Sequence, residues 1–392
     1  MYQYVAFLLA LLFSGVVYPM PLTVTVVTVN GENRLSAGKS FAGITVETKR
    51  PVIRAVELAM YESSTLFETL GITPIIEQLE LDVGQAWEET LKELPPDSVL
   101  ILDVPRDYIE RIARQVHASG MIAFNVRHSD PSLRESLCLD TLYHTIPSDH
   151  MYFDALGQFL VFRGWRKVLL VHGPSENDKR RASLLAQSIK KFGANVVDER
   201  TFSLSHHPDD RDENRPDFLT GGVSYDVVAV IDSNKDYGRY LQYSTRSPRP
   251  VVGDIGLTPV SWHRTLERYG APQLNERYRQ FKPLAALGPN ATMTDAEFAA
   301  WSAIKLLSNN IHRYRGELLD LKALLNDPES QVDLYKGTRG SIRKWNNQLR
   351  QPMLLATNQA VIAVAPMPKF LHPTHYVDTL GLDEPESECK LR

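Results

Sequence analysis

The chain has 392 residues, of which 43% are hydrophobic and 23% are charged, and its net charge is −4. Because this length exceeds what one hydrophobic core usually supports, we expect two domains or two lobes. The composition is ordinary for a soluble globular protein, and the small negative charge argues against a nucleic-acid-binding protein, which would show a basic excess.

The chain begins with an apolar run at residues 4–17, followed by Pro19 and Pro21. The run has the length of a secretory signal peptide and is too short to span a bilayer comfortably. A buried helix is the alternative, because no Lys or Arg precedes the run and no clear cleavage site follows it. We favour a signal peptide over residues 1–20, since the prolines break the helix and a strand-like run follows at 22–29. The mature protein is then expected to be exported, with no stable membrane insertion.

From residue 50 onward, amphipathic helical patterns alternate with short apolar runs. The predicted helices are 51–70, 84–94, 106–120, 151–165, 178–192 and 234–244. The predicted strands are 72–81, 98–105, 121–126, 167–173, 194–202, 225–233 and 249–256. Repeated βα units of this kind indicate parallel sheets with helices on both faces.

An irregular segment near residue 146 separates two such arrays, and the chain closes with further helices over 273–325 and two apolar strands at 353–357 and 360–366. The predicted fold is therefore α/β, with two doubly wound parallel-sheet lobes joined by a hinge. We expect residues 21–146 and 254–325 in lobe I, residues 147–253 and 326–368 in lobe II, and residues 369–392 as a C-terminal tail.

In open parallel sheets, ligands bind beyond the carboxyl ends of the strands, so two such lobes should face each other across a binding cleft. Polar caps and turn residues are the alternative explanation for most side chains at these positions. Trp262 also follows a predicted strand end, although loop packing explains it equally well. Trp301 lies on an apolar helix face, where core packing is the default. The candidate ligand-binding residues are Asp103, Asn125, Arg127, His172, Asp232, Asp254, Leu257, Trp262 and Trp301.

The sequence gives no positive sign of catalysis or of a metal site. His206 and His207 lie in a polar, acidic loop, where a solvated loop is a better explanation than a closed metal site. Neither a G-x-S-x-G nor an H-E-x-x-H motif occurs. We therefore expect a protein that is not an enzyme and has no catalytic cofactor.

The chain has two cysteines, Cys138 and Cys389. In an oxidising compartment, so sparse a pair indicates a structural disulfide rather than a metal or redox site, with two free buried thiols as the alternative. A bridge between them would tie the C-terminal tail to the first half of the chain.

The stretch SIRKWNNQLRQP, residues 341–352, combines cationic, aromatic and amide side chains just before the last strands. It could bind nucleic acid, line a pocket for an acidic ligand or form the edge of a sheet. The net charge disfavours nucleic acid. We interpret the stretch mainly as a structural turn into the last strand pair, with Arg343 and Trp345 as its only side chains that could reach the cleft.

The export signal, the two βα lobes, the returning helices and the final strand pair together resemble type I periplasmic solute-binding proteins, which include the branched-chain amino-acid receptors of ABC transporters. The segment YKGTRGSIRKWNNQL, with its Gly-x-x-Gly turn, looks like the closing segment of that family. A narrower resemblance is to the substrate-binding protein associated with PQQ-dependent alcohol dehydrogenase systems. It is carried by residues 142–148, 162–174, 249–264, 299–304, 348–357 and 370–387.

This resemblance implies a periplasmic, non-catalytic binding protein that closes on its ligand by a hinge. It also implies a disulfide, because that branch has cysteines at the positions of Cys138 and Cys389. The implied ligand is pyrroloquinoline quinone (PQQ), and the implied partner is an ABC permease or a PQQ-dependent dehydrogenase. A tricarboxylate needs cationic forks, backbone N–H groups and an aromatic plate, and Arg127, His172, Trp262 and Trp301 are of suitable types.

Two other functions fit the same fold. An amino-acid receptor would need an acid for the ammonium group, which Asp103, Asp232 or Asp254 could supply. A sensor or docking protein would have a cleft filled by its own side chains, whereas an open cleft would favour a binding protein.

Overall fold

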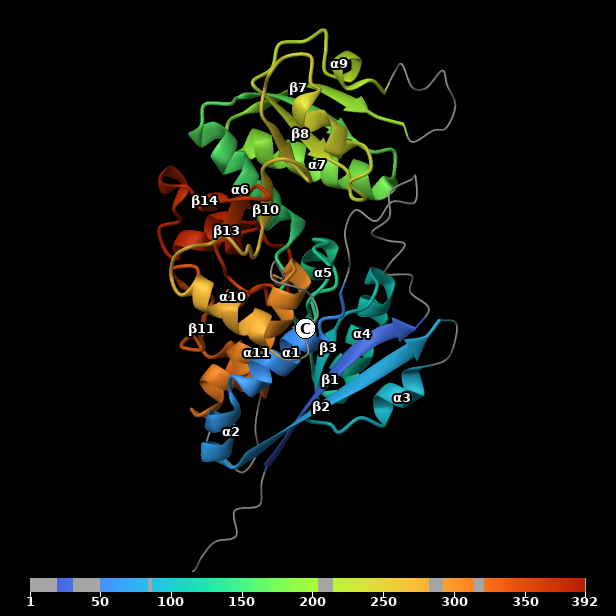
Figure 1. Cartoon of the computed structure of the whole chain (residues 1–392). Helices are drawn as coiled ribbons and strands as arrows, with labels where there is room; N and C mark the ends of the chain where they lie inside the picture. The colour runs from blue at the N-terminus through green and yellow to red at the C-terminus, as the bar shows by residue number, and fades with distance from the viewer. Residues whose placement is uncertain are drawn as a thin grey trace, which may run out of the picture.

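The computed structural model describes residues 20–30, 50–83, 87–203, 214–281, 292–313 and 321–391. These residues form two α/β lobes, with lobe I in the lower half of Figure 1 and lobe II in the upper half. Residues 1–19 of the expected signal peptide lie outside the described residues, as do His206 and His207. Within the part of the chain that is described, no helix has both the length and the apolar character needed to cross a membrane.

Lobe I contains a five-stranded parallel sheet. Its strand order is β2-β1-β3-β4-β5. The strands are β1 (Met20–Asn30), β2 (Ile72–Asp82), β3 (Val99–Leu102), β4 (Ile122–Asn125) and β5 (Leu142–His144). The central strands are apolar on both faces because helices cover both sides, whereas the outer strand β2 is largely exposed.

The helices of lobe I come from both halves of the chain, and α1 and α11 pack together on one face of the sheet. The expected helix over 51–70 is divided in two, because Ser63 leaves the helical conformation. The helices are α1 (Ile53–Tyr61), α2 (Ser64–Leu70), α3 (Glu88–Lys92), α4 (Arg106–Ser119), α5 (Ser132–Glu135), α10 (Ala271–Gln280), α11 (Asp295–Ile311) and α12 (Leu321–Asn326).

Lobe II contains a four-stranded parallel sheet in the order β7-β6-β8-β9. Its elements are α6 (Asp149–Phe162), β6 (Lys167–His172), α7 (Glu176–Lys191), β7 (Asn195–Thr201), α9 (Pro216–Leu219), β8 (Val227–Ile231), η2 (Gly238–Tyr243) and β9 (Val251–Gly253). The expected α-helix at 234–244 is the short 3-10 helix η2. The core of lobe II forms where α6 and α7 pack on the sheet.

A small antiparallel sheet lies between the lobes. It joins β10 (Thr258–Val260), β13 (Met353–Ala356) and β14 (Val361–Ala365) in the order β10-β13-β14. Side chains alternate along a strand, so Met353 and Leu355 enter the core of lobe II while Leu354 enters the core of lobe I. This strand therefore forms part of the hinge.

Two of the expected lobe boundaries differ from the way the described residues pack. Residues 326–349, expected in lobe II, give Val332, Leu334, Ile342 and Leu349 to the core of lobe I. The reason is that Gln348 pairs with His144 at the end of β5, which extends the sheet of lobe I. In addition, Leu257 packs in the core of lobe II, although residue 254 was the expected start of a return to lobe I.

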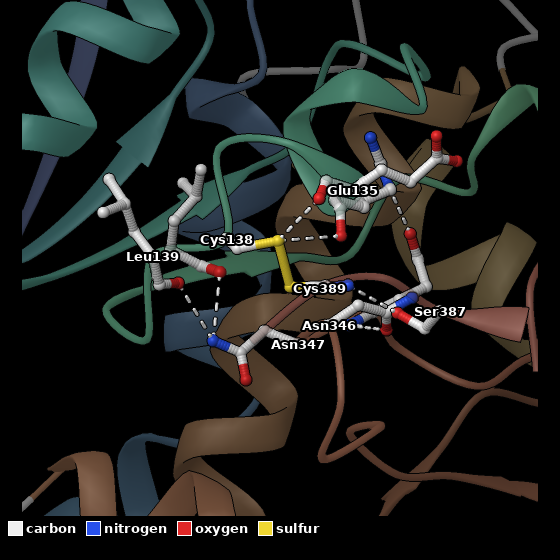
Figure 2. The surroundings of a disulfide bond; sticks show 10 residues. Glu135, Cys138, Leu139, Asn346, Asn347, Ser387 and Cys389 are labelled. Carbon is white, nitrogen blue, oxygen red and sulfur yellow. Dashed lines mark hydrogen bonds between the residues drawn. A yellow bond between two sulfur atoms is a disulfide. The ribbon is translucent and has the colours of Figure 1, made fainter. Parts of the chain in front are cut away.

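The remaining elements lie near the C-terminus. The hairpin strands β11 (Val332–Asp333) and β12 (Arg339–Gly340) precede β13. Three short 3-10 helices, η4 (Pro368–Phe370), η5 (Tyr376–Thr379) and η6 (Glu384–Glu386), lie in the tail. The tail ends at a disulfide between Cys389 and Cys138, with 5.5 Å between their Cα atoms (Figure 2).

Candidate functional site

A cavity of about 680 Å³ lies between the two lobes. Lobe I lines it with the first turn of α4 and the loop after β4, and lobe II lines it with the first turns of α6 and α7 and the loops after β8 and β9. Residues 258–260, Trp262 and residues 292–295 complete its wall. The cavity thus lies at the carboxyl ends of the strands, where parallel sheets usually bind ligands.

Arg181 and Asp254 form a bidentate ion pair in the cavity wall. The guanidinium donates two hydrogen bonds to the carboxylate, with N–O distances of 2.6 and 2.8 Å. Asp254 also accepts a hydrogen bond from the backbone N–H of Asp232, at 2.9 Å. Burial alone would raise the pKa of Asp254, but the Arg181 charge outweighs it and holds this pKa below its usual value. The pair therefore stays ionised and fixes the shape of the lobe II wall.

A second set of charges crosses the cleft from one lobe to the other. Asp130 of lobe I lies 3.1 Å from Arg106 of its own lobe and 4.0 Å from Arg180 of lobe II. Arg180 also contacts Asp149 at 3.1 Å. Burial opposes ionisation of Asp130, yet hydrogen bonds from Ser132 and the two arginines lower its pKa overall. The position of Arg180 therefore couples the two lobes electrostatically.

Tyr152 and Asp295 connect the cavity to the hinge. The Tyr152 hydroxyl donates to Asp295 at 2.6 Å, and the second carboxylate oxygen accepts from the backbone N–H groups of Ser261 and Trp262 at 3.0 and 3.3 Å. Burial and the nearby Asp295 charge raise the pKa of Tyr152 well above its usual value. Tyr152 consequently remains a neutral hydrogen-bond donor at the cavity wall.

Three of the nine predicted ligand residues line the cavity: Asp232, Asp254 and Trp262. Asp232 accepts hydrogen bonds from the backbone N–H groups of Tyr237 and Gly238, both at 2.8 Å, and burial raises its pKa. Trp262 is 3% exposed and stacks on Phe298 with 4.6 Å between ring centroids. Trp262 therefore lies at the floor of the cavity, with little of its ring accessible for stacking on a ligand.

Asp103, Asn125 and Arg127 do not line the cavity and instead shape the loops beside it. The buried Asn125 side chain accepts from the backbone N–H groups of Arg127 and His128 and donates to the carbonyl of His128. These bonds fix the turn that presents Ser129 and Asp130. Asp103 accepts from the backbone N–H of Val52 at 3.2 Å, and the Arg127 guanidinium lies 3.9 Å from its carboxylate.

His172, Leu257 and Trp301 do not line the cavity. His172 is buried beside the carbonyl of Gly173 and lies 3.3 Å from Glu199 on β7. Leu257 belongs to the core of lobe II. Trp301 is fully buried in lobe I and donates to Glu62 at 3.0 Å, because its helix face turns inward toward α1.

The sequence interpretation missed the residues that begin the helices around the cleft. Asp149 opens α6 after the N-cap Ser148, Asp295 opens α11 after the N-cap Thr294, and Arg180 and Arg181 follow the N-cap Ser175 of α7. The capping residues were a usable signal, because the N-terminus of a helix after a parallel strand points to the same edge as the strand's end. Among the described residues, no group of three or more His, Cys, Asp or Glu side chains could hold a metal ion.

The stretch 341–352 serves the structure and does not reach the cavity. Arg343 is 1% exposed and bonds Asp378 and the carbonyls of Val377 and Leu380, while the Trp345 indole donates to the carbonyl of Leu382. Both side chains hold the C-terminal tail.

Comparisons with known proteins show similarity at the level of structure. No family model and no curated protein matches the chain. A branched-chain amino-acid ABC transporter periplasmic ligand-binding protein from Burkholderia xenovorans LB400 superposes with a TM-score of 0.68 at 12% identity, covering 94% of this chain and 99% of its own. A solute-binding protein of an ABC transporter from R. palustris, solved with benzoate, gives 0.63 at 12% identity, with 95% and 100% covered. The leucine-, isoleucine-, valine-, threonine- and alanine-binding protein from Brucella ovis, in a closed conformation, gives 0.63 at 13% identity, with 95% and 99% covered.

The chain therefore has the fold of the type I periplasmic binding proteins, with parallel sheets in both lobes. At these identities the similarity establishes the fold, and the ligand has to be argued from the cavity itself.

Proposed function

We propose that this protein is a periplasmic solute-binding protein that captures a small charged molecule between its lobes and delivers it to a membrane transporter or to a periplasmic dehydrogenase. The observation that carries the proposal is the open cavity of about 680 Å³, lined by charged side chains from both lobes. A sensor or docking protein with a filled cleft would lack this space. Binding without chemistry is the simplest use of such a site.

The lining favours a ligand that carries both charge signs. Five carboxylates, Asp130, Asp149, Asp232, Asp254 and Asp295, stand against the cations Arg106, Arg180, Arg181 and Lys235. Each arginine already has a carboxylate partner. A zwitterion such as an amino acid can exchange contacts with such pairs without leaving a buried charge unpaired, which would be costly. The amino acids and the benzoate named for two of the structural neighbours are close in size to such a zwitterion.

Pyrroloquinoline quinone is the second candidate ligand. What supports it is the set of guanidinium groups that face the cavity, since arginine forks match carboxylates well. A trianion would have to draw these arginines away from their aspartate partners or enter together with protons or cations. The carboxylates of the wall would therefore attract the ammonium group of a zwitterion but repel the trianion.

The test is a titration of the purified protein with leucine, with benzoate and with pyrroloquinoline quinone. Binding is measured by calorimetry and by the intrinsic tryptophan fluorescence, to which Trp262 at the cavity floor contributes. We expect one saturable site, with affinity reduced at least tenfold in Tyr152→Phe and in Arg180→Met, because both side chains line the cavity. Asp130→Asn should weaken binding of a zwitterion and strengthen binding of the quinone.

The matched control is Lys179→Met, a neighbouring position on α7 whose side chain pairs with Glu176 at the surface. Its affinity should equal that of the wild type. If none of the three compounds binds and none raises the melting temperature, a docking protein that retains the fold becomes the better interpretation.

A further inference from the structure

We propose that the C-terminal tail, residues Met367–Cys389, is a strap that joins the two lobes covalently and limits how far the cleft can open. Over the residues that the structure describes, the main chain passes between the lobes at three places, before α6, around β10, and between Leu349 and Met353. The tail adds a fourth connection, which the disulfide completes. The proposal concerns lobe movement and does not depend on which ligand the cleft binds.

The tail is fixed to lobe II along α6 and α7. The backbone N–H of Met367 donates to Gln158 at 3.0 Å, and that of Gly381 donates to Asp154 at 2.9 Å. Met367 and Leu380 enter the core of lobe II. Lys191 of α7 contacts the carbonyl of Gly381 and the carboxylate of Glu386, both at 3.4 Å. The first two thirds of the tail thus move with lobe II.

The same part of the tail is held by residues that belong to lobe I. Arg343 follows Ile342, a core residue of lobe I, and its buried guanidinium bonds Asp378 at 2.9 Å and the carbonyl of Leu380 at 2.8 Å. Arg350 bonds Asp378 as well, at 2.9 and 3.0 Å. Asp378 therefore receives two guanidinium groups from the lobe I side, in a position where little water reaches it.

The two sets of contacts meet at Gly381. Its φ of +87° is one that L side chains rarely adopt, and a Cβ at this position would lie 3.0 Å from Met151 of α6 and 3.2 Å from Arg343. The tail consequently occupies a tight gap between an element of lobe II and a segment of lobe I. A hinge motion that widens this gap must break the Arg343 contacts or the Asp154 contacts.

The disulfide makes this connection permanent. Cys138 follows α5, and both Leu133 of α5 and the adjacent Leu139 pack in a core of lobe I. Figure 2 shows the bridge from Cys138 to Cys389, with Asn347 below it donating to the carbonyl of Leu139. The last buried contacts of the tail with lobe II are at Leu380 and Gly381, whereas the ion pair of Glu386 with Lys191 is partly exposed. Residues 382–388 link Gly381 to Cys389, so the bridge limits the distance between these two Cα atoms to at most about 28 Å when the lobes move apart.

The experiment compares the ligand-free wild type with a Cys138→Ser, Cys389→Ser double variant by small-angle X-ray scattering and by amide hydrogen exchange. We expect the variant to show a larger radius of gyration and exchange roughly tenfold faster in residues 257–261 and 350–353, where the chain crosses between lobes. Circular dichroism should remain unchanged, because each lobe keeps its own core.

A phosphine reductant added to the folded wild type gives the same comparison without a folding step, and it should reproduce the change while leaving the double variant unaffected. Asp378→Asn, which weakens the arginine contacts but keeps the disulfide, should give a smaller increase in exchange and no change in radius. If scattering and exchange stay identical after the disulfide is lost, the tail does not restrain the lobes and the proposal is wrong.

Discussion

At the scale of single residues, the best-defined interaction in the cleft is the Arg181–Asp254 pair. Replacing Asp254 by Asn removes the bidentate anionic partner of a guanidinium whose side chain is only 18% exposed, and leaves it the more distant Asp149 carboxylate at 3.6 Å. We expect Asp254→Asn to lower the free energy of unfolding by about 3 kcal/mol, as is usual when one partner of a buried pair is removed. Urea unfolding measures this difference. Glu176→Gln, on the surface of the same helix, is the control and should change nothing measurable.

Lys336 is a buried cation at the hinge. Its ammonium group donates to the carbonyls of Ser261 and Pro352, both at 3.0 Å, and to the side chain of Gln351 at 2.6 Å. It therefore bonds two of the chain segments that cross between the lobes. Burial lowers the pKa of Lys336 to about 7, against a partial opposing effect from the charge of Asp295.

This pKa predicts how stability depends on pH. Between about pH 7 and the ordinary lysine value of 10.5, the unfolded chain binds more protons at this site than the folded chain, so the free energy of unfolding rises with pH. The free energy of unfolding of the wild type minus that of Lys336→Met should increase by about 2 kcal/mol from pH 7 to pH 9. Chemical unfolding at several pH values tests this. A difference independent of pH would mean that Lys336 remains charged throughout the range.

At the scale of elements, α11 is the helix that organises lobe I. Residues on nearly every side of it are buried, and it is capped by a reciprocal Thr294–Glu297 capping box. Trp262, Phe298 and Trp301 stack in sequence, with ring centroids 4.6 and 5.8 Å apart. The helix thus links the cavity floor at Trp262 to the interior of the lobe.

Trp301→Phe should lower the free energy of unfolding by about 2 kcal/mol, because it leaves a void and removes the hydrogen-bond donor to Glu62. Its affinity for any cleft ligand should match that of the wild type. Tyr243→Phe, at a side chain that is 91% exposed, serves as the control for stability. A large loss of ligand affinity with an unchanged free energy of unfolding would indicate that Trp301 contacts the ligand.

At the scale of the whole molecule, the Arg180–Asp130 contact is an ion pair across the cleft. The side chains are 38% and 18% exposed and their charges lie 4.0 Å apart, so the pair contributes less than about 1 kcal/mol. Arg180→Met should therefore shift the ligand-free molecule toward open forms by up to about fivefold. Scattering at low and high salt tests this: salt should open the wild type and have little effect on the variant. An equal response of both proteins to salt would exclude the pair as a latch.

Local sequence patterns determined the strands and most of the helices, and with them the α/β class and the order of the two lobes. A β-branched apolar run such as Val24–Val29 forms a buried parallel strand wherever helices cover both its faces, and this pattern needs no knowledge of distant contacts. The same patterns placed Asp232 and Asp254 at strand ends, and both line the cavity, whereas Asp103, Asn125 and His172, chosen by the same rule, do not.

Tertiary structure alone decided which polar residues meet in the cavity and where the aromatic side chains lie. Trp301 and Glu62 are 239 residues apart, and Arg343 meets Asp378 only because the tail folds back between the lobes. Periodicity identifies an inward face of a helix, but it does not tell whether that face meets a core or a cavity. The stretch 341–352 illustrates the difference: the sequence favoured a structural turn but left Arg343 and Trp345 as side chains that could reach the cleft. The fold turns Arg343 and Arg350 toward the buried Asp378, because a buried guanidinium is stable only where an anion and carbonyl oxygens surround it.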